Sequence, residues 1–137
     1  MADSGLIHGV FMDLSHGIYH IEVIGRMIIV ELCSGFNEYT VVKYNNDMKA
    51  IIEGFSGDEF TILIKSFEFT GGTPEAFRIS NEFNKWVNTQ NLLGKAIVHK
   101  SNILVDIARE QESALAEQNI AEFDNENGAI EWLQSLS

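Results

Sequence analysis

The residues best suited to chemistry form one short run, Thr70-Gly71-Gly72-Thr73, between an apolar segment and Pro74. The apolar segment predicts a strand, and a proline in this place is typical of the first position of a helix. Paired glycines allow the backbone to turn with positive φ, and a helix N-terminus offers unpaired N–H groups and the positive end of a dipole. We therefore expect an anion, or a phosphate on Thr70 or Thr73, to be stabilised in this loop. The simpler alternative is that Thr73 only caps the helix and that the glycines only form a turn.

Four aromatic side chains flank this run in the sequence: Phe67, Phe69, Phe77 and Trp86. Large aromatic side chains most often pack in a hydrophobic core, which is the interpretation that we favour. A gap between helices would instead make these four residues a pocket for an apolar or lipid-like ligand.

A metal site is the third chemical alternative. His16, His20 and Glu22 share the parity of one strand, and two imidazoles with a carboxylate can bind zinc or iron. Alternating polar residues are also typical of the solvated face of a hairpin, so we predict no metal and no cofactor. No nucleophile elbow, Walker loop or Gly-x-Gly-x-x-Gly run is present, and Cys33 ends an apolar run as a small buried hydrophobe would. These patterns predict a protein that is not an enzyme.

The overall composition restricts the partners. The chain has 137 residues and a formal net charge of −11, from nine basic and twenty acidic residues. Phosphate backbones and anionic lipid surfaces repel such a chain, so we expect no nucleic acid and no membrane as partners. No apolar run is long enough for a membrane span, and the first residues do not resemble a secretory leader, which predicts a cytoplasmic protein. The length predicts one domain over residues 1–137, with residues 1–16 as an N-terminal arm that holds at most a short edge strand.

The elements that would position these residues follow from apolar periodicity and turn signals. Strands that alternate with helices imply right-handed crossovers and a largely parallel sheet, with an antiparallel hairpin at the start. The acidic stretch at 109–117 is typical of the solvated face of a helix. The predicted elements are a hairpin at 18–24 and 27–32, a helix from Asn37 to about residue 53, a strand at 61–69, a helix from Pro74, a strand at 96–98 within 95–100, a helix from residue 101 or 102 to 115, a strand at 120–123 and a terminal helix.

Three segments, taken in this order, carry a likeness to a known fold. The hairpin leads to the first helix through Cys33-Ser34-Gly35-Phe36-Asn37-Glu38-Tyr39, and a small-residue loop after the third strand leads to the helix with Trp86. The chain closes on Ala121-Glu122-Phe123-Asp124 and Ala129-Ile130-Glu131-Trp132-Leu133. From about Gly17 onward this resembles the SpoIIAA-like, or STAS, fold, and more narrowly the STAS/SEC14 domain proteins. The resemblance implies an α/β domain of three layers, with a mixed but mostly parallel sheet, an N-terminal β-hairpin and about four helices.

The resemblance also implies a kind of function. In anti-sigma-factor antagonists of this fold, a serine in an Asp-Ser-x-Gly loop after the third strand is phosphorylated by a partner kinase and thereby switches binding. Residues 68–73 hold no Asp-Ser pair here, so Thr70 or Thr73 would have to take that place. The implied protein is a bacterial, cytoplasmic, non-enzymatic regulatory module with an unidentified protein partner, as a monomer or a homodimer. The alternative that the SEC14 name suggests is a domain for a small apolar or lipid-like ligand.

Overall fold

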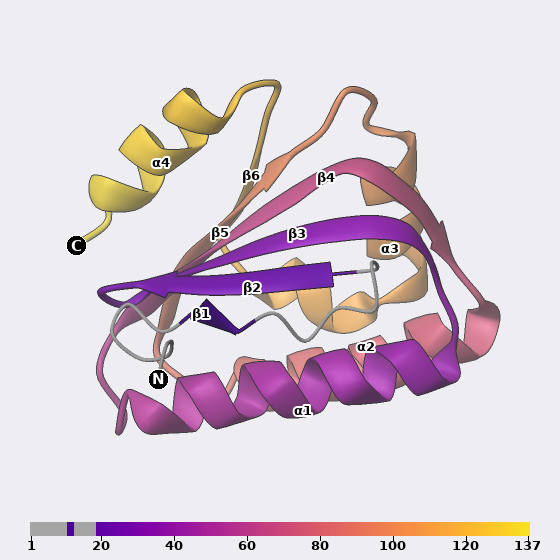
Figure 1. Ribbon diagram of the computed structural model, residues 1–137, viewed down its shortest axis with the longest axis horizontal. Helices are drawn as coiled ribbons and strands as arrows, with labels where there is room; N and C mark the ends of the chain where they lie inside the picture. The colour runs from indigo at the N-terminus through magenta and orange to yellow at the C-terminus, as the bar shows by residue number, and fades with distance from the viewer. Residues whose placement is uncertain (1–10, 13–18) are drawn as a thin grey trace.

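The computed structural model describes residues 11–12 and 19–137 (Figure 1). The predicted N-terminal arm, residues 1–16, therefore lies outside the described residues except for one short strand. The elements are β1 (Phe11–Met12), β2 (Tyr19–Ile24), β3 (Met27–Phe36), α1 (Glu38–Gly54), β4 (Phe60–Gly72), α2 (Pro74–Val87), β5 (Leu92–Val98), α3 (Ile103–Gln111), the 3-10 turn η1 (Ser113–Glu117), β6 (Ile120–Phe123) and α4 (Glu126–Gln134).

One mixed sheet holds the fold together. Among the described residues, its six strands lie in the order β1-β2-β3-β4-β5-β6. The pairs β1–β2 and β2–β3 are antiparallel, and the pairs β3–β4, β4–β5 and β5–β6 are parallel. Gly25 and Arg26 form the predicted hairpin turn between β2 and β3. Of these two residues only Gly25 has a positive φ, 61°, as a type II′ turn requires. The order of elements and the sheet that the sequence predicts are confirmed.

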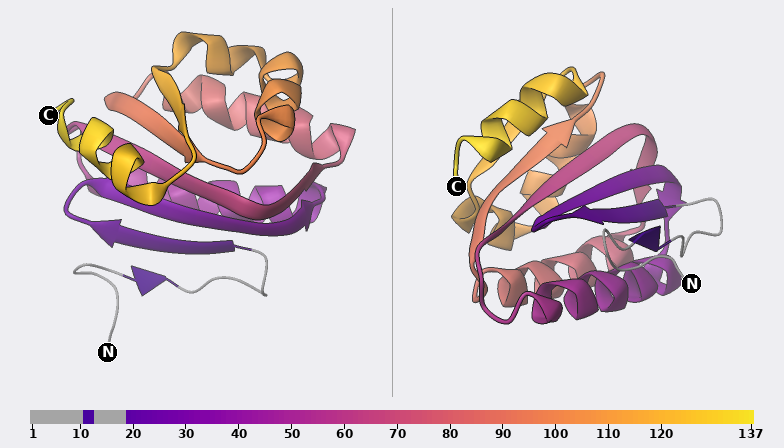
Figure 2. Two further views of the ribbon diagram at one scale, coloured as in Figure 1. Left: turned by 90° about the horizontal axis from the view of Figure 1, so that it is seen from above. Right: turned by 60° about the vertical axis from the view of Figure 1, so that its left-hand side comes forward.

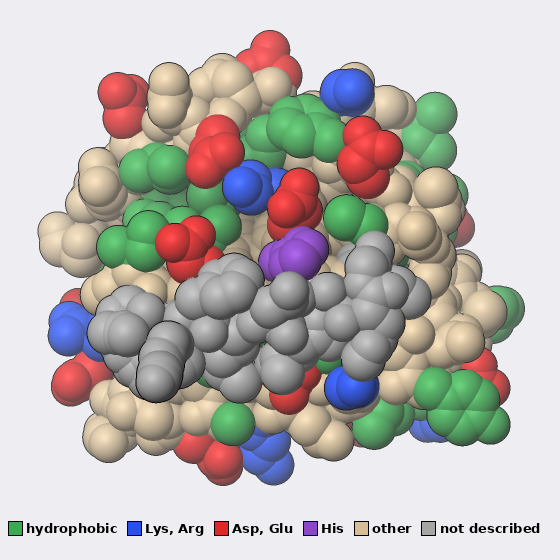
Figure 3. Space-filling view, in the orientation of Figure 1, with side chains coloured by type: hydrophobic (Ala, Val, Ile, Leu, Met, Phe, Trp, Pro, Cys, Tyr) green, Lys and Arg blue, Asp and Glu red, His purple; other side chains and the backbone are tan. Residues whose placement is uncertain are grey.

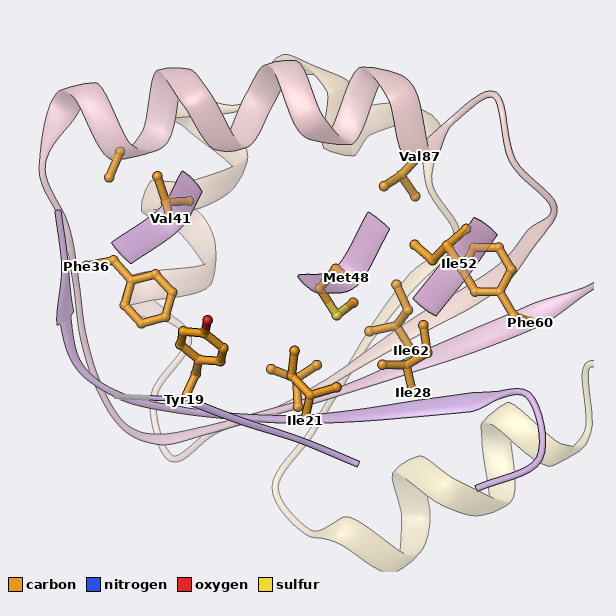
Figure 4. Close-up of a cluster of buried hydrophobic side chains, with 12 residues drawn as sticks. Tyr19, Ile21, Ile28, Phe36, Val41, Met48, Ile52, Phe60, Ile62 and Val87 are labelled. Carbon is orange, nitrogen blue, oxygen red and sulfur yellow. The ribbon is translucent and has the colours of Figure 1, made fainter. Parts of the chain in front are cut away.

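Helices cover both faces of this sheet and give it three layers. Helices α1 and α2 run side by side on one face, and α4 lies on the other (Figures 1 and 2). Because successive residues of a strand point to opposite faces, Ile28 and Ile62 pack under α1 and α2, whereas Ile29 and Leu63 pack under α4. Figure 4 shows the larger of the two clusters, whose buried members are Tyr19, Ile21, Ile28, Val30, Phe36, Val41, Met48, Ile52, Phe60, Ile62, Ala76 and Val87.

The glycine run is not the loop that the sequence predicts. Strand β4 continues through Gly72, and β3 continues through Phe36, so that Gly35 pairs with Gly71 and Phe36 with Gly72. The pairing uses backbone groups alone, which explains why residues with low strand propensity take part in it. Gly71 adopts a φ of 114°, a conformation that other residues rarely reach, next to a shift in the register of the two strands. The glycines thus allow an irregular pairing of β3 with β4 and do not form a turn.

The chain after α3 also differs from the prediction. We expected one helix as far as Leu115, but α3 ends at Gln111 and a 3-10 turn follows. Glu112, between them, has φ −122° and ψ 89°, outside the helical region, and it is buried. The break turns Leu115 toward the core and Glu112 inward, so this glutamate is not on a solvated helix face as expected. Strand β5 likewise begins at Leu92, three residues before the predicted start.

Helix starts agree with the predictions. The side chains of Asn37, Thr73 and Asn125 each accept a hydrogen bond from the backbone N–H three residues later, which caps α1, α2 and α4. Within residues 11–12 and 19–137, no helix combines the length and apolar character needed to cross a membrane. On the face that Figure 3 shows, basic side chains are scattered among acidic ones and do not gather into a patch.

Candidate functional site

The first turn of α2 uses most of its own hydrogen-bonding groups. The Thr73 hydroxyl accepts a hydrogen bond from the Ala76 N–H at 3.1 Å, and the Thr73 carbonyl accepts one from the Phe77 N–H at 3.0 Å. Pro74 has no N–H, so the N–H of Glu75 is the one left in this turn. The Glu75 carboxylate also lies at this helix end. The first turn of α2 therefore has far fewer free N–H groups to bind an anion than the sequence suggests.

Thr70 has a different environment from Thr73. Both threonines are exposed, and with Gly71 and Gly72 they border a shallow depression against residues 35–37 at the start of α1, but only the Thr73 hydroxyl caps a helix. Parallel strands end at the same edge of a sheet, which explains why the starts of α1 and α2 meet here. The structure thus leaves the Thr70 hydroxyl accessible and engages that of Thr73 as a cap.

A cavity of about 160 Å³ lies deeper, between the sheet and the helices α1, α2 and α3. Its walls are mainly aliphatic and aromatic, and its polar residues are gathered at α2, β5 and the end of α3. The lining residues are Leu32, Phe36, Val41, Tyr44, Met48, Ile62, Ile64, Phe69, Gly72, Ala76, Phe77, Ser80, Phe83, Asn84, Val87, Lys95, Ile97, Ala108, Glu112 and Leu115.

The structure brings together two of the four predicted pocket aromatics. Phe69 and Phe77 line the cavity, whereas Phe67 and Trp86 do not. Phe67 is 39% exposed beneath the Lys100 ammonium, and Trp86 stacks on Phe83, which lines the cavity, without lining it itself.

Phe67 and Phe69 are two positions apart and would face the same side of a regular strand. Strand β4 is irregular at this point. Glu31 pairs with Lys65 and Cys33 with Glu68, so β4 advances by one residue more than β3. Such a bulge reverses which residues face the helices, and simple alternation cannot reveal it. The sequence prediction therefore assigned both phenylalanines to one possible pocket.

The polar end of the cavity is a buried network centred on Asn84. Its Oδ1 accepts hydrogen bonds from Lys95 Nζ at 3.3 Å and from Gln118 Nε2 at 3.0 Å. Its Nδ2 donates to Glu112 Oε1 at 3.0 Å, and the Ser80 hydroxyl donates to the same oxygen at 2.7 Å. Lys95 is 9% exposed and Glu112 is 6% exposed, so an ammonium and a carboxylate are both held away from water.

Burial changes the proton affinity of both charged groups. It lowers the pKa of Lys95 from 10.5 to about 8, although the charge of Glu112 works in the opposite direction. Burial raises the pKa of Glu112, against the influence of Ser80, Lys95 and Asn84. The pKa of Tyr44, which also lines the cavity, is raised by burial and by the charge of Glu112. These shifts indicate a site of low polarity in which each charge depends on its few neighbours.

Sequence reasoning missed Lys95, Glu112 and Asn84. Two signals could have indicated them. Ser80 and Asn84 are polar residues four positions apart on the otherwise apolar side of α2, and Lys95 interrupts the apolar run of β5 at a position that faces the helices. A polar residue repeated on a core face is a sign of a buried network.

The other candidate groups are not assembled into a site. Among the residues that the structure describes, no three His, Cys, Asp or Glu side chains could hold a metal ion together. His20 and Glu22 lie on one side of β2, while His16 is outside the described residues. Cys33 is half-buried, and burial together with the Glu31 and Glu68 carboxylates raises the pKa of its thiol, which disfavours the reactive thiolate.

Comparison with known proteins gives a structural neighbour for the fold. No protein-family model matches the chain, and no curated protein matches it in sequence. A solved structure is similar over nearly its whole length: an uncharacterized protein of the DUF3478 family with a SpoIIAA-like fold, from Shewanella loihica PV-4. The TM-score is 0.67 at 13% sequence identity, and the match covers 94% of this chain and 99% of the other. The chain thus has a SpoIIAA-like fold, which confirms the α/β class that its motifs resemble.

Proposed function

We propose that the protein is a non-enzymatic binding module that holds a small, mainly apolar ligand between its sheet and helices α1, α2 and α3. The observation that supports this proposal best is the cavity of about 160 Å³ with its apolar walls and its single polar end. Ligand sites in proteins typically combine mostly apolar walls with a few convergent polar groups. An apolar cavity of about 150 Å³ is large enough to bind benzene, so the expected ligand is of that size.

The wall chemistry favours a ring or a short branched chain. Phe36 and Phe69 meet edge to face with their ring centroids 5.4 Å apart, and Phe36 and Tyr44 meet similarly at 5.9 Å. These rings present flat, rigid apolar surfaces to the cavity, with little side-chain entropy to lose on binding. The apolar-ligand alternative that the sequence suggested is therefore retained with a change of residues. Phe69 and Phe77 line the cavity, whereas Phe67 and Trp86 lie outside it.

Two measurements test this proposal. Organic extraction and mass spectrometry of protein from its own cells should find a stoichiometric small molecule. After this molecule has been removed from the protein, added toluene should shift the methyl NMR signals of Ile62, Ile64 and Ile97, which line the cavity. Ala108→Leu places a larger side chain at the wall and should abolish these shifts. Ala50→Leu, at an exposed position of α1, is the matched control. If toluene leaves the three isoleucines of the unaltered protein unchanged, the proposal is wrong.

A regulatory module with a protein partner is the second candidate. It is favoured by the exposed Thr70 at the edge where α1 and α2 begin, together with Tyr39, which is 79% exposed in the first turn of α1. Native mass spectrometry of protein from its own cells would show a phosphate on Thr70 and a bound partner. Thr70→Ala should abolish both, whereas Thr73→Ser keeps the helix cap and should retain them. An unmodified chain without partner would contradict this candidate.

A further inference from the structure

The polar end of the cavity has hydrogen-bonding capacity that the protein itself does not use. The Lys95 ammonium carries three donors, and its partner among the described residues is Asn84. Glu112 receives the Ser80 and Asn84 hydrogen bonds on Oε1, which leaves Oε2 for another donor. Both residues line the cavity and both are more than nine-tenths buried. A donor and an acceptor are therefore available side by side where water has little access.

The charges of this pair restrict what can join it. Lys95 and Glu112 do not form a direct ion pair, and Asn84 lies between them with one hydrogen bond to each. Together the two groups are neutral, so a charged head group would bring an unbalanced charge into a buried site. An unbalanced buried charge is costly, whereas a neutral group that satisfies both partners is not.

We propose that the cavity recognises uncharged, benzene-sized compounds whose head group, a primary carboxamide or a close equivalent, accepts a hydrogen bond from Lys95 and donates one to Glu112. This rests on the proposed function and specifies the ligand class. The amide oxygen would lie toward β5 and the amide nitrogen toward the end of α3. The apolar body would then lie against Ile64, Phe69 and Ile97.

A set of monosubstituted benzenes tests the head group. Toluene, benzamide, benzoate and benzylamine share one ring and differ in charge and hydrogen bonding. We expect benzamide to bind the unaltered protein at pH 7 about tenfold more tightly than toluene, because hydrogen bonds to charged groups contribute most. Benzoate and benzylamine should bind more weakly than benzamide. The affinities are read from the methyl NMR shifts of Ile64 and Ile97.

Two variants should change which head group the cavity binds most tightly. Glu112→Gln turns the acceptor that faces the ligand into a donor and leaves the Lys95 charge unbalanced, so benzoate should become the tightest ligand. Lys95→Met leaves the Glu112 charge unbalanced, and benzylamine should then bind best. A preserved spread of methyl signals confirms that each variant is folded, and if neither folds, the comparison on the unaltered protein decides.

Each outcome has a separate meaning. Benzamide as the tightest ligand, with the change of preference in the two variants, supports the inference. If toluene binds as tightly as benzamide, or benzoate binds the unaltered protein best, the head-group inference is wrong while the proposed function stands. If none of the four compounds binds, toluene included, the proposed function itself is wrong.

Discussion

Asn84 on α2 accepts a hydrogen bond from Lys95 on β5 at 3.3 Å, inside the layer between helices and sheet. The same side-chain amide donates to Glu112, so one residue satisfies a buried positive and a buried negative group at once. An amide can do this because it carries an acceptor and a donor on the same carbon. Asn84 therefore links the two charged groups at the polar end of the cavity, where Ser80 and Gln118 add further hydrogen bonds.

Replacing this amide should destabilise the protein strongly. Asn84→Leu keeps the branched shape of the side chain but leaves the Lys95 ammonium and part of the Glu112 carboxylate without partners, and we expect a loss of about 3 kcal/mol in the free energy of unfolding. Urea denaturation at pH 7 measures it. Asn46→Leu, at an exposed position of α1, is the control and should change the free energy by less than about 0.5 kcal/mol. Equal effects of the two substitutions would contradict the role given to Asn84.

Stability should depend on pH through Lys95. Its pKa in the folded protein is about 8, below the 10.5 of an unperturbed lysine, so the unfolded chain binds more protons between these values. The free energy of unfolding contributed by this group should therefore rise with pH from about 8 to about 10, by at most about 1.4 kcal/mol per pH unit. Lys95→Met should remove the rise. A difference between the two proteins that does not vary with pH would show that Lys95 is not buried as a titrating group.

The charge of Glu112 should act on this titration. Because the carboxylate favours the protonated form of Lys95, Glu112→Gln should lower the pKa of Lys95 further below about 8. NMR detection of the Lys95 side chain during a pH titration measures the change. Glu110→Gln, at an exposed position of α3, should leave the titration unchanged. A rise in the pKa of Lys95 on Glu112→Gln would contradict the electrostatic coupling.

The two threonines of the sheet edge should differ in their effect on stability. Thr73→Ala removes the oxygen that accepts from the Ala76 N–H, and loss of such a cap typically costs about 1 kcal/mol. Thr73→Ser should restore most of this stability because it keeps the hydroxyl. Thr70→Ala, at an exposed position, should have little effect. Thermal unfolding of the three variants makes the comparison, and a destabilising Thr70→Ala would contradict it.

Two glycines should respond oppositely to the same substitution. A Cβ at Gly94 would lie 2.5 Å from Leu136 Cδ1 and 3.0 Å from the Trp132 ring, so Gly94→Ala must displace these two side chains, which pack α4 and the chain end onto the sheet. Overpacking of this kind typically costs about 1–3 kcal/mol. A Cβ at Gly54, in the last turn of α1, meets nothing within 4 Å, and Gly54→Ala should leave stability unchanged or raise it. Urea denaturation distinguishes the two, and equal stability of both variants would show that α4 does not pack closely at Gly94.

The sequence was sufficient for the type and order of the elements, but not for several of their ends or for the cavity. Caps such as Asn37 and Thr73, and the alternation in β2, depend on neighbouring residues and could be recognised locally. The pairing of Gly35 with Gly71 and the bulge in β4 depend on two segments far apart in the chain. The environment of Glu112 depends on the break after α3, which brings its carboxylate to α2. Contacts of this kind follow from tertiary structure, so a local pattern could only suggest a solvated glutamate.

Strand β6 has a consequence for how copies of the protein can associate. It is the outermost strand on its side of the sheet and only four residues long, Ile120–Phe123. It carries Glu122, which contacts His99 at 2.8 Å and Arg109 at 3.6 Å. A short outer strand with charged side chains gives another chain few backbone groups to pair with, which protects against growth of the sheet from molecule to molecule. A homodimer of the kind that the resemblance implies would therefore have to form through side chains rather than through this edge.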